Sequence, residues 1–115
     1  MKKVYLIGNA KGNAAFAIQQ FQQAQTELEA SGYDVVNFTN TMAGWHEVDR
    51  KSLLKHRLNA MLKCNTVFVL PDWQNDDLAL IELAASYTAG IDVIRANNAI
   101  IPHTLNVYHS KGSHV

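Results

Sequence analysis

Short apolar runs alternate with longer amphipathic segments along this chain, and this alternation constrains its fold more than any other feature. Runs typical of β-strands occupy residues 4–7, 34–38, 66–70 and 92–94. Segments with helical periodicity fill the three intervals between them. This β-α-β-α-β-α-β order predicts an α/β domain, in which a parallel sheet carries helices on both faces and right-handed connections.

The first two predicted helices each have an apolar stripe. The helix at residues 14–30 ends near Gly32, and its apolar face consists of Ala17, Phe21, Ala24 and Leu28. Asp49 or Ser52 caps the second helix, whose apolar stripe consists of Leu54, Leu58, Met61 and Leu62. We expect the basic side chains of this helix on a solvated face: Lys51, Lys55, Arg57 and Lys63.

The third helix is predicted from about Leu78 to Ala89. Its N-cap is Asp76 or Asp77, because a short carboxylate side chain can accept the free N–H groups of the first turn. Gly90 is the expected stop. The helix therefore begins directly after the loop that follows the third strand.

Length and composition predict one domain over residues 1–115, with 105–108 as a candidate fifth strand and 110–115 as a flexible tail. The chain is 48% hydrophobic and 17% charged, which suits a folded core. Ten basic and ten acidic side chains give a formal net charge of zero. We therefore expect no attraction to a nucleic-acid polymer or an acidic membrane, and the low charge fits a homo-oligomer at least as well as a monomer.

The single cysteine, Cys64, favours a reducing compartment. It can form no intrachain disulfide, and zinc clusters with the usual cysteine spacings are excluded. No apolar run approaches the roughly 18 residues that a membrane helix requires, and the run at 4–7 is too short for a signal peptide. We expect a cytoplasmic protein.

Ligands of open parallel sheets bind beyond the carboxyl ends of the strands, where the strand order reverses. Three loops reach that edge here, at residues 8–13, 39–47 and 71–77. The side chains and backbone that could contact a substrate there are Gly8, Asn9, Trp45, Asp72, Trp73 and Asp77. The two tryptophans are either packing lids or stacking surfaces for a base or a sugar.

Glu82 is a candidate catalytic carboxylate, with Tyr5 and Asp76 as its neighbours. Glu82 lies on the side of the third helix that also carries Leu78, Ala85 and Ala89. It is either a solvated helix residue or a buried acid, and an unpaired buried acid is costly. Tyr5, in the first strand, is core filler or a hydroxyl that needs a polar partner. Asp76 is equally well explained as a helix cap.

Other motifs support no cofactor. The loop at 8–13 matches neither a dinucleotide-binding fingerprint nor a P-loop. His103, His109 and His114 fall in the tail, where a mobile segment is a better interpretation than a metal site. We predict neither a metal ion nor an organic cofactor.

Three stretches resemble the nucleoside 2-deoxyribosyltransferase-like superfamily, and most closely its small, functionally uncharacterised branch. They are the strand and glycine at 4–8, the segment at 32–37 after the Phe21 helix, and the segment at 62–73. Their order and spacing extend the resemblance over residues 3–94. It implies a flavodoxin-like three-layer sandwich whose four or five strands are ordered 2-1-3-4(-5), and self-association into a homodimer or larger assembly.

The resemblance also implies a chemistry. In that family a helix glutamate attacks the anomeric carbon of a nucleoside sugar, and Glu82 occupies the matching position. Asp76 matches the acid that holds the sugar and manages the leaving base, and Tyr5 matches the tyrosine that orients the nucleophile. A carboxylate stabilises the positive charge that develops on the sugar and can form a covalent intermediate. No cofactor is implied.

This chain departs from the family pattern at several positions. Asn9, Asp76 and Leu78 stand where proline, serine and glycine are usual, and His56-Arg57 stands where an Arg-Asp pair is common. Three functions are therefore compared. The first is cleavage or transfer at the N-glycosidic bond of a nucleoside or nucleotide. The second is binding of such a ligand without catalysis, and the third is a structural oligomer without a ligand.

Overall fold

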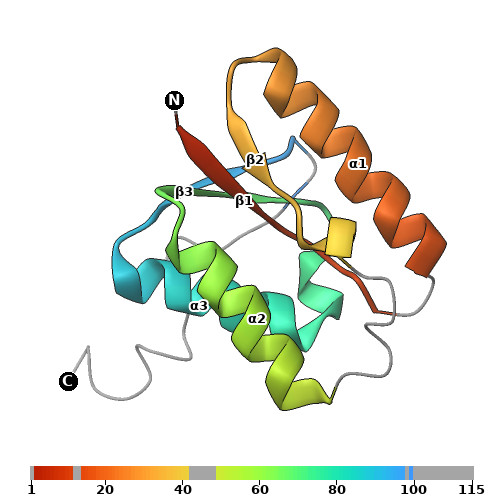
Figure 1. The fold of residues 1–115 in the computed structure, drawn as a ribbon, viewed down its shortest axis with the longest axis vertical. Helices are drawn as coiled ribbons and strands as arrows, with labels where there is room; N and C mark the ends of the chain where they lie inside the picture. Colours follow the sequence, from red (N-terminus) through yellow and green to blue (C-terminus); the bar gives the residue numbers. More distant parts are fainter. Residues whose placement is uncertain (1, 12–13, 42–48, 98, 100–115) are drawn as a thin grey trace.

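The computed structural model describes residues 2–11, 14–41, 49–97 and 99 (Figure 1). Its elements, in chain order, are β1 (Lys3–Ile7), α1 (Ala14–Ala30), β2 (Asp34–Val36), the 3₁₀ turn η1 (Phe38–Thr41), α2 (Arg50–Leu62), β3 (Thr66–Val69), the 3₁₀ turn η3 (Trp73–Asn75), α3 (Asp77–Ala89) and β4 (Asp92–Arg95). The predicted β-α-β-α-β-α-β order is confirmed.

The four strands form one all-parallel sheet in the order β2-β1-β3-β4. Helix α1 lies on one face of this sheet, and α2 and α3 lie on the other (Figure 1). The architecture is the predicted flavodoxin-like α/β fold. The strand order reverses between β1 and β3, so the carboxyl ends of these two strands mark the place where such folds bind ligands.

The pairing register assigns side chains to the two faces of the sheet. Tyr5 pairs with Val67 and faces α3, whereas Leu6 pairs with Phe68 and faces the α1 side. Successive residues of a strand point to opposite faces, so β1 contributes to both halves of the core. Its residues 4–7 have no exposed surface, as expected for a central parallel strand.

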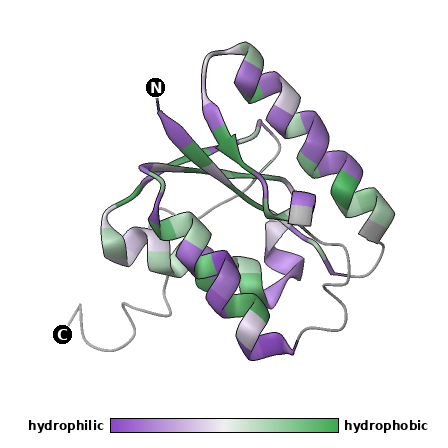
Figure 2. Ribbon diagram, viewed as in Figure 1, coloured by the Kyte–Doolittle hydropathy of each residue, from purple (hydrophilic) through white to green (hydrophobic). Residues whose placement is uncertain are grey.

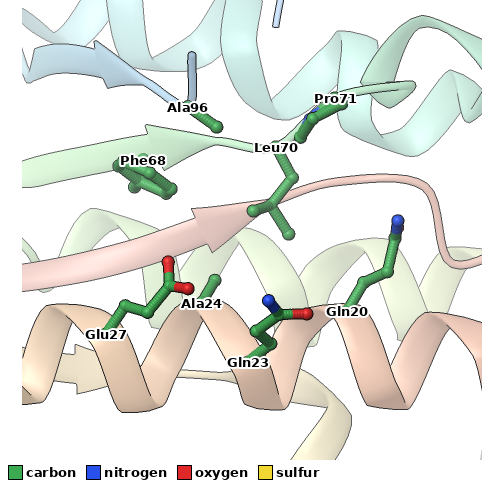
Figure 3. A pocket seen from close by; sticks show the side chains of 8 residues that line it. All are labelled: Gln20, Gln23, Ala24, Glu27, Phe68, Leu70, Pro71 and Ala96. Carbon is green, nitrogen blue, oxygen red and sulfur yellow. The ribbon is translucent and has the colours of Figure 1, made fainter. Parts of the chain in front are cut away.

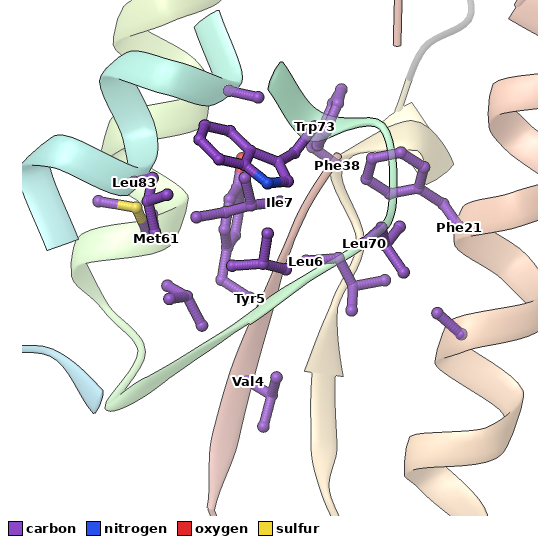
Figure 4. Packing of buried hydrophobic residues seen from close by; sticks show 14 of the residues in the cluster. Val4, Tyr5, Leu6, Ile7, Phe21, Phe38, Met61, Leu70, Trp73 and Leu83 are labelled. Carbon is purple, nitrogen blue, oxygen red and sulfur yellow. The ribbon is translucent and has the colours of Figure 1, made fainter. Parts of the chain in front are cut away.

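The core follows the predicted apolar stripes (Figures 2 and 4). All four residues predicted for the apolar face of α1 are at most 9% exposed. Leu28 lies at the end of this stripe, and its carbonyl accepts the N–H of Tyr33 (3.1 Å). Gly32 adopts the left-handed conformation (φ 95°) after α1, and Gly90 does so after α3 (φ 74°). Both glycines are the helix ends that the sequence predicts.

Asp49 and Asp76 are the N-caps of α2 and α3. The Asp49 carboxylate accepts the backbone N–H of Ser52 (2.8 Å), and Asp76 accepts that of Leu78 (2.9 Å). Asp77 is therefore the first residue of α3 rather than its cap.

Two predictions about the packing are wrong. Phe38 does not extend β2, because the Asn37 side chain accepts the N–H of Thr39 (3.0 Å) and turns the chain there. The Phe38 ring instead packs edge-on against Phe21, with 5.1 Å between ring centroids. Leu62 is also not part of the α2 core stripe, because its side chain is 54% exposed.

Several sequence predictions fall on residues outside the described ranges. These are the ligand contact at Trp45, the candidate fifth strand at 105–108 and the flexible tail at 110–115. Among the helices that the structure describes, none combines the length and the apolar composition needed to cross a membrane.

Candidate functional site

The loops after β1 and β3 are joined by hydrogen bonds at the carboxyl edge of the sheet. The Asn9 side-chain amide donates to the Asp72 carboxylate (2.9 Å), and the Ala10 backbone N–H donates to Asp76 Oδ2 (2.9 Å). Asp72 has a left-handed backbone (φ 68°), a conformation that aspartate tolerates better than most residues. Three predicted site residues, Asn9, Asp72 and Asp76, are thus brought together.

Below this edge, Tyr5, Arg57 and Glu82 form a buried polar group that we call the Glu82 cluster. The Tyr5 hydroxyl donates a hydrogen bond to Glu82 Oε2. Arg57 Nε donates to the same oxygen (3.1 Å), and Arg57 Nη2 donates to Oε1 (2.6 Å). The guanidinium therefore binds the carboxylate as a two-pronged fork, the strongest geometry for such a pair.

The Glu82 cluster is closed to solvent, since Tyr5 and Glu82 have no exposed surface and Arg57 is 1% exposed. Burial raises the pKa of the Glu82 carboxyl, while the charge and hydrogen bonds of Arg57 and the hydrogen bond of Tyr5 oppose that rise. Burial by itself would lower the pKa of the Arg57 guanidinium, but Glu82 raises it above its usual value. Burial and the Glu82 charge raise the pKa of Tyr5 well above 10.0.

The prediction that Arg57 lies on a solvated basic face of α2 is wrong, because Arg57 is buried. Its guanidinium lies over the Phe38 ring, with 4.2 Å from Cζ to the ring centroid, and contacts Glu82 on α3. The sequence did contain a signal that the Arg57 side chain lies on the apolar side of α2. Arg57 stands three residues after Leu54 and four before Met61, so it shares their face of the helix.

Asp76 connects the Glu82 cluster to the edge loops. Its Oδ1 accepts the N–H groups of Leu78 (2.9 Å) and Ala79 (3.4 Å), as a helix cap does. Its Oδ2 accepts the Ala10 N–H and lies 3.8 Å from Arg57 Nη1. Asp76 is 3% exposed, so both explanations proposed for it, a cap and a member of the site, agree with its position.

A cavity of about 100 Å³ lies beside the Glu82 cluster. Its lining includes the buried Arg57 and Asp76, the apolar Leu53 and Leu78, and the exposed Asp77. The Asp77 carboxylate pairs with Arg50 and lies 3.9 Å from Lys11 Nζ. Desolvation is the largest single contribution and raises the pKa of Asp77, but the hydrogen bond and charge of Arg50 together with the charge of Lys11 outweigh it, so the pKa is lowered.

Gly8 and Trp73 have clear packing roles. A Cβ atom at Gly8 would lie 3.0 Å from side-chain atoms of both Leu70 and Phe21, so glycine lets α1 approach the end of β1. Trp73 is 5% exposed and belongs to the core cluster with Ile7 and Leu70 (Figure 4). Of the two interpretations of Trp73, a packing lid or a stacking surface, its position agrees with packing, because η3 folds its indole inward. Substrate contacts by Gly8 and Trp73 stay predictions.

The described part of the chain contains no group of three or more histidine, cysteine or carboxylate side chains placed to hold a metal ion. Two acidic side chains at this edge instead accept hydrogen bonds from other side chains of the protein. Asp72 accepts from Asn9 and Asn75, and Asp77 accepts from Arg50. Polar partners within the protein therefore account for these carboxylates.

Residues 2–95 match the family model of a domain of unknown function, DUF4406. This chain belongs to that family. The matched segment contains all four strands, the three helices and the whole Glu82 cluster. No curated protein and no solved structure matches the chain. Because the family description states no activity, the function has to be inferred from the geometry.

Proposed function

We propose that this domain cleaves or transfers at the N-glycosidic bond of a nucleoside or nucleotide, with Glu82 as the nucleophile. The observation that carries the proposal is the Glu82 cluster itself. A buried carboxylate is held by a phenol and a guanidinium, next to a second carboxylate, at the strand-order reversal between β1 and β3. Open parallel α/β sheets bind their ligands at that position.

The hydrogen bonds of Glu82 suit an oriented nucleophile. Oε2 accepts two hydrogen bonds, from Tyr5 and from Arg57 Nε, whereas Oε1 accepts one from Arg57 Nη2 among the described contacts. A carboxylate oxygen has two acceptor positions, so Oε1 keeps one for attack. Burial raises the pKa of Glu82, and Arg57 opposes part of that rise, so the guanidinium acts in favour of the ionised form that a nucleophile requires.

The proposed reaction proceeds in two displacements. Glu82 Oε1 forms a bond to the anomeric carbon while the bond from that carbon to the base nitrogen breaks, and the electron pair leaves with the base. A proton from solvent neutralises the base nitrogen, and in hydrolysis the attacking water later returns one proton to solvent. Water or a second base next attacks the anomeric carbon and returns the electron pair to Glu82, giving hydrolysis or transfer. In this scheme Asp76 accepts hydrogen bonds from the sugar, and Tyr5 holds the nucleophile.

Leu78 limits access to the nucleophile in this proposal. It is 5% exposed, lines the cavity of about 100 Å³ and stands one turn before Glu82 on α3. Small-molecule sites usually enclose about 300–1,000 Å³. A sugar can reach Glu82 only if the Leu78 side chain moves away from the cavity.

A second candidate function is binding of a nucleoside or nucleotide without catalysis. The same burial favours it, because Glu82 has no exposed surface and its carboxylate already pairs with Arg57. In this alternative the Glu82 cluster stabilises the fold, and the ligand occupies only the outer edge near Asn9 and Asp72. The two candidate functions predict different results when the protein is incubated with the same panel of nucleosides and nucleotides.

The deciding experiment incubates the protein with a panel of deoxynucleosides and deoxynucleotides and measures free base by chromatography. Release that is lost in Glu82→Gln but kept in Glu29→Gln, an exposed carboxylate on α1, supports the enzyme. Circular dichroism verifies that the Glu82 variant is folded. Ligand-dependent thermal stabilisation without base release supports the binding protein. The structural alternative is supported if neither effect occurs.

We also propose that the protein is a cytoplasmic homo-oligomer. Leu80 and Ile81 of α3 are each 40% exposed, and α3 carries no charged side chain except Asp77 and the buried Glu82. A helix face with apolar residues and no charges is typical of a self-associating surface. Sedimentation would show a dimer or larger species, and Ile81→Lys would shift it to the monomer.

A further inference from the structure

The two faces of the sheet differ in how completely helices cover them. Of the helices that the structure describes, α1 alone lies on its face, and it packs against β1 and β2 (Figure 1). On the same face, β3 and β4 carry Phe68, which is half-buried, and Ile94, which is 37% exposed. The described elements therefore leave part of an apolar sheet surface open beside α1.

A groove of about 330 Å³ occupies this position, on the opposite side of the sheet from the Glu82 cluster. Its floor is apolar, with Phe68, Leu70 and Ala96 at the ends of β3 and β4. Its wall is one side of α1, formed by Gln20, Gln23 and Glu27 (Figure 3). The volume and the mixture of an apolar floor with a few polar groups are those of small-molecule sites.

The polar side chains of the wall have no hydrogen-bond or ion-pair partner among the described residues. Neighbouring polar residues of α1 do have partners. The Gln25 amide donates to Glu29 (3.1 Å), and Gln22 donates to Asn40. Among the described residues, the groove thus presents one carboxylate and two amides without partners over an apolar surface. A ligand with the opposite charge and an apolar body would satisfy both features.

We propose that this groove binds a small organic cation that carries a flat apolar ring, such as an aromatic amine. The ammonium group pairs with Glu27, the amides of Gln20 and Gln23 orient it, and the ring lies on Phe68 and Leu70. Cations are attracted to aromatic faces, so Phe68 contributes to the recognition of charge as well as shape. This site is separate from the proposed catalytic site, so either can fail without the other.

The test compares benzylamine with benzoate, two probes of similar size and opposite charge. Binding is followed by NMR on the isotope-labelled full chain. Benzylamine is expected to shift the side-chain amides of Gln20 and Gln23 and the backbone N–H of Ala96, whereas benzoate leaves them unchanged. Glu27→Gln should weaken benzylamine binding about fivefold, as expected for one partly exposed charge pair. Glu29→Gln, two residues away on α1, should not change it.

Phe68→Leu provides a second variant, because it keeps the apolar volume and removes the ring. It should also weaken benzylamine binding. The proposal is overturned if benzoate and benzylamine act alike, or if Glu27→Gln and Glu29→Gln have the same effect. It is also overturned if the signals of the groove depend on protein concentration and Glu27→Gln abolishes that dependence, since a second copy of the chain would then be the occupant.

Discussion

Replacing Arg57 by methionine should strongly destabilise the fold, because it leaves the Glu82 carboxylate buried without its cation. The guanidinium makes two hydrogen bonds of 2.6 and 3.1 Å to Glu82, and neither side chain is more than 2% exposed. Removing one partner of such a pair costs about 3–5 kcal/mol. A domain of this size has a total stability of about 5–15 kcal/mol, so the loss is a large fraction of it.

Urea unfolding provides the assay. With a slope of about 1–3 kcal/mol per molar urea, the Arg57→Met midpoint should fall by roughly 2 M. Arg50→Met is the matched control, because Arg50 also pairs with a carboxylate but its side chain is 59% exposed and that of Asp77 is 50% exposed. Exposed pairs contribute little, so this midpoint should hardly move.

The double variant Arg57→Met with Glu82→Leu tests the reason for the loss. Removing both charges should recover most of the stability, since a well-packed apolar replacement of a buried ion pair is often neutral. Equal effects of Arg57→Met and Arg50→Met would refute the buried pair. So would a double variant that is as unstable as the sum of its single changes.

Three further predictions follow from the same contacts. Since the pKa of Tyr5 is raised well above 10.0, its contribution to stability is complete below pH 10 and is lost above it, at about 1.4 kcal/mol per pH unit. In chemical unfolding, the stability of the natural protein should therefore fall more steeply with pH than that of Tyr5→Phe, in which Tyr87 still has a raised pKa; equal slopes would contradict the prediction. Leu78→Ala should enlarge the cavity of about 100 Å³ and increase the thermal stabilisation by nucleosides, whereas an unchanged ligand response would show that Leu78 does not limit access. Gly8→Ala should lower the stability by about 1–3 kcal/mol through overpacking, because its Cβ would lie 3.0 Å from Phe21 and Leu70; a fully stable variant in thermal unfolding would disprove that close approach.

The sequence predicted the succession of strands and helices because local signals define these elements and their ends, whereas the order of the strands in the sheet was implied by the family resemblance. Apolar runs, aspartate caps and glycine stops each act within a few residues, and the structure confirms the caps at Asp49 and Asp76 and the ends at Gly32 and Gly90. The contact between Tyr5 and Glu82 was also expected, since β1 and β3 are neighbours and α3 follows β3.

The local rules left the positions of Arg57 and Trp73 undecided, because helix periodicity alone does not separate a buried Arg57 from a solvated one, and Trp73 had two interpretations. A charged residue on a helix is normally solvated, and only a carboxylate on a different helix explains why Arg57 is buried. Trp73 follows a strand, where a loop tryptophan is often exposed, but the 3₁₀ turn at η3 directs it into the core. The burial of both side chains depends on tertiary contacts between segments that are distant in the sequence.

The most direct test of the proposed chemistry is the mass of the protein during turnover of a deoxynucleoside, after rapid acid quenching and peptide mapping. The proposal predicts a peptide containing Glu82 that is heavier by one deoxyribosyl group, together with free base in the same sample. Base release with the added mass on another residue, or bound nucleoside with neither adduct nor free base, would contradict the assignment of Glu82 as the nucleophile.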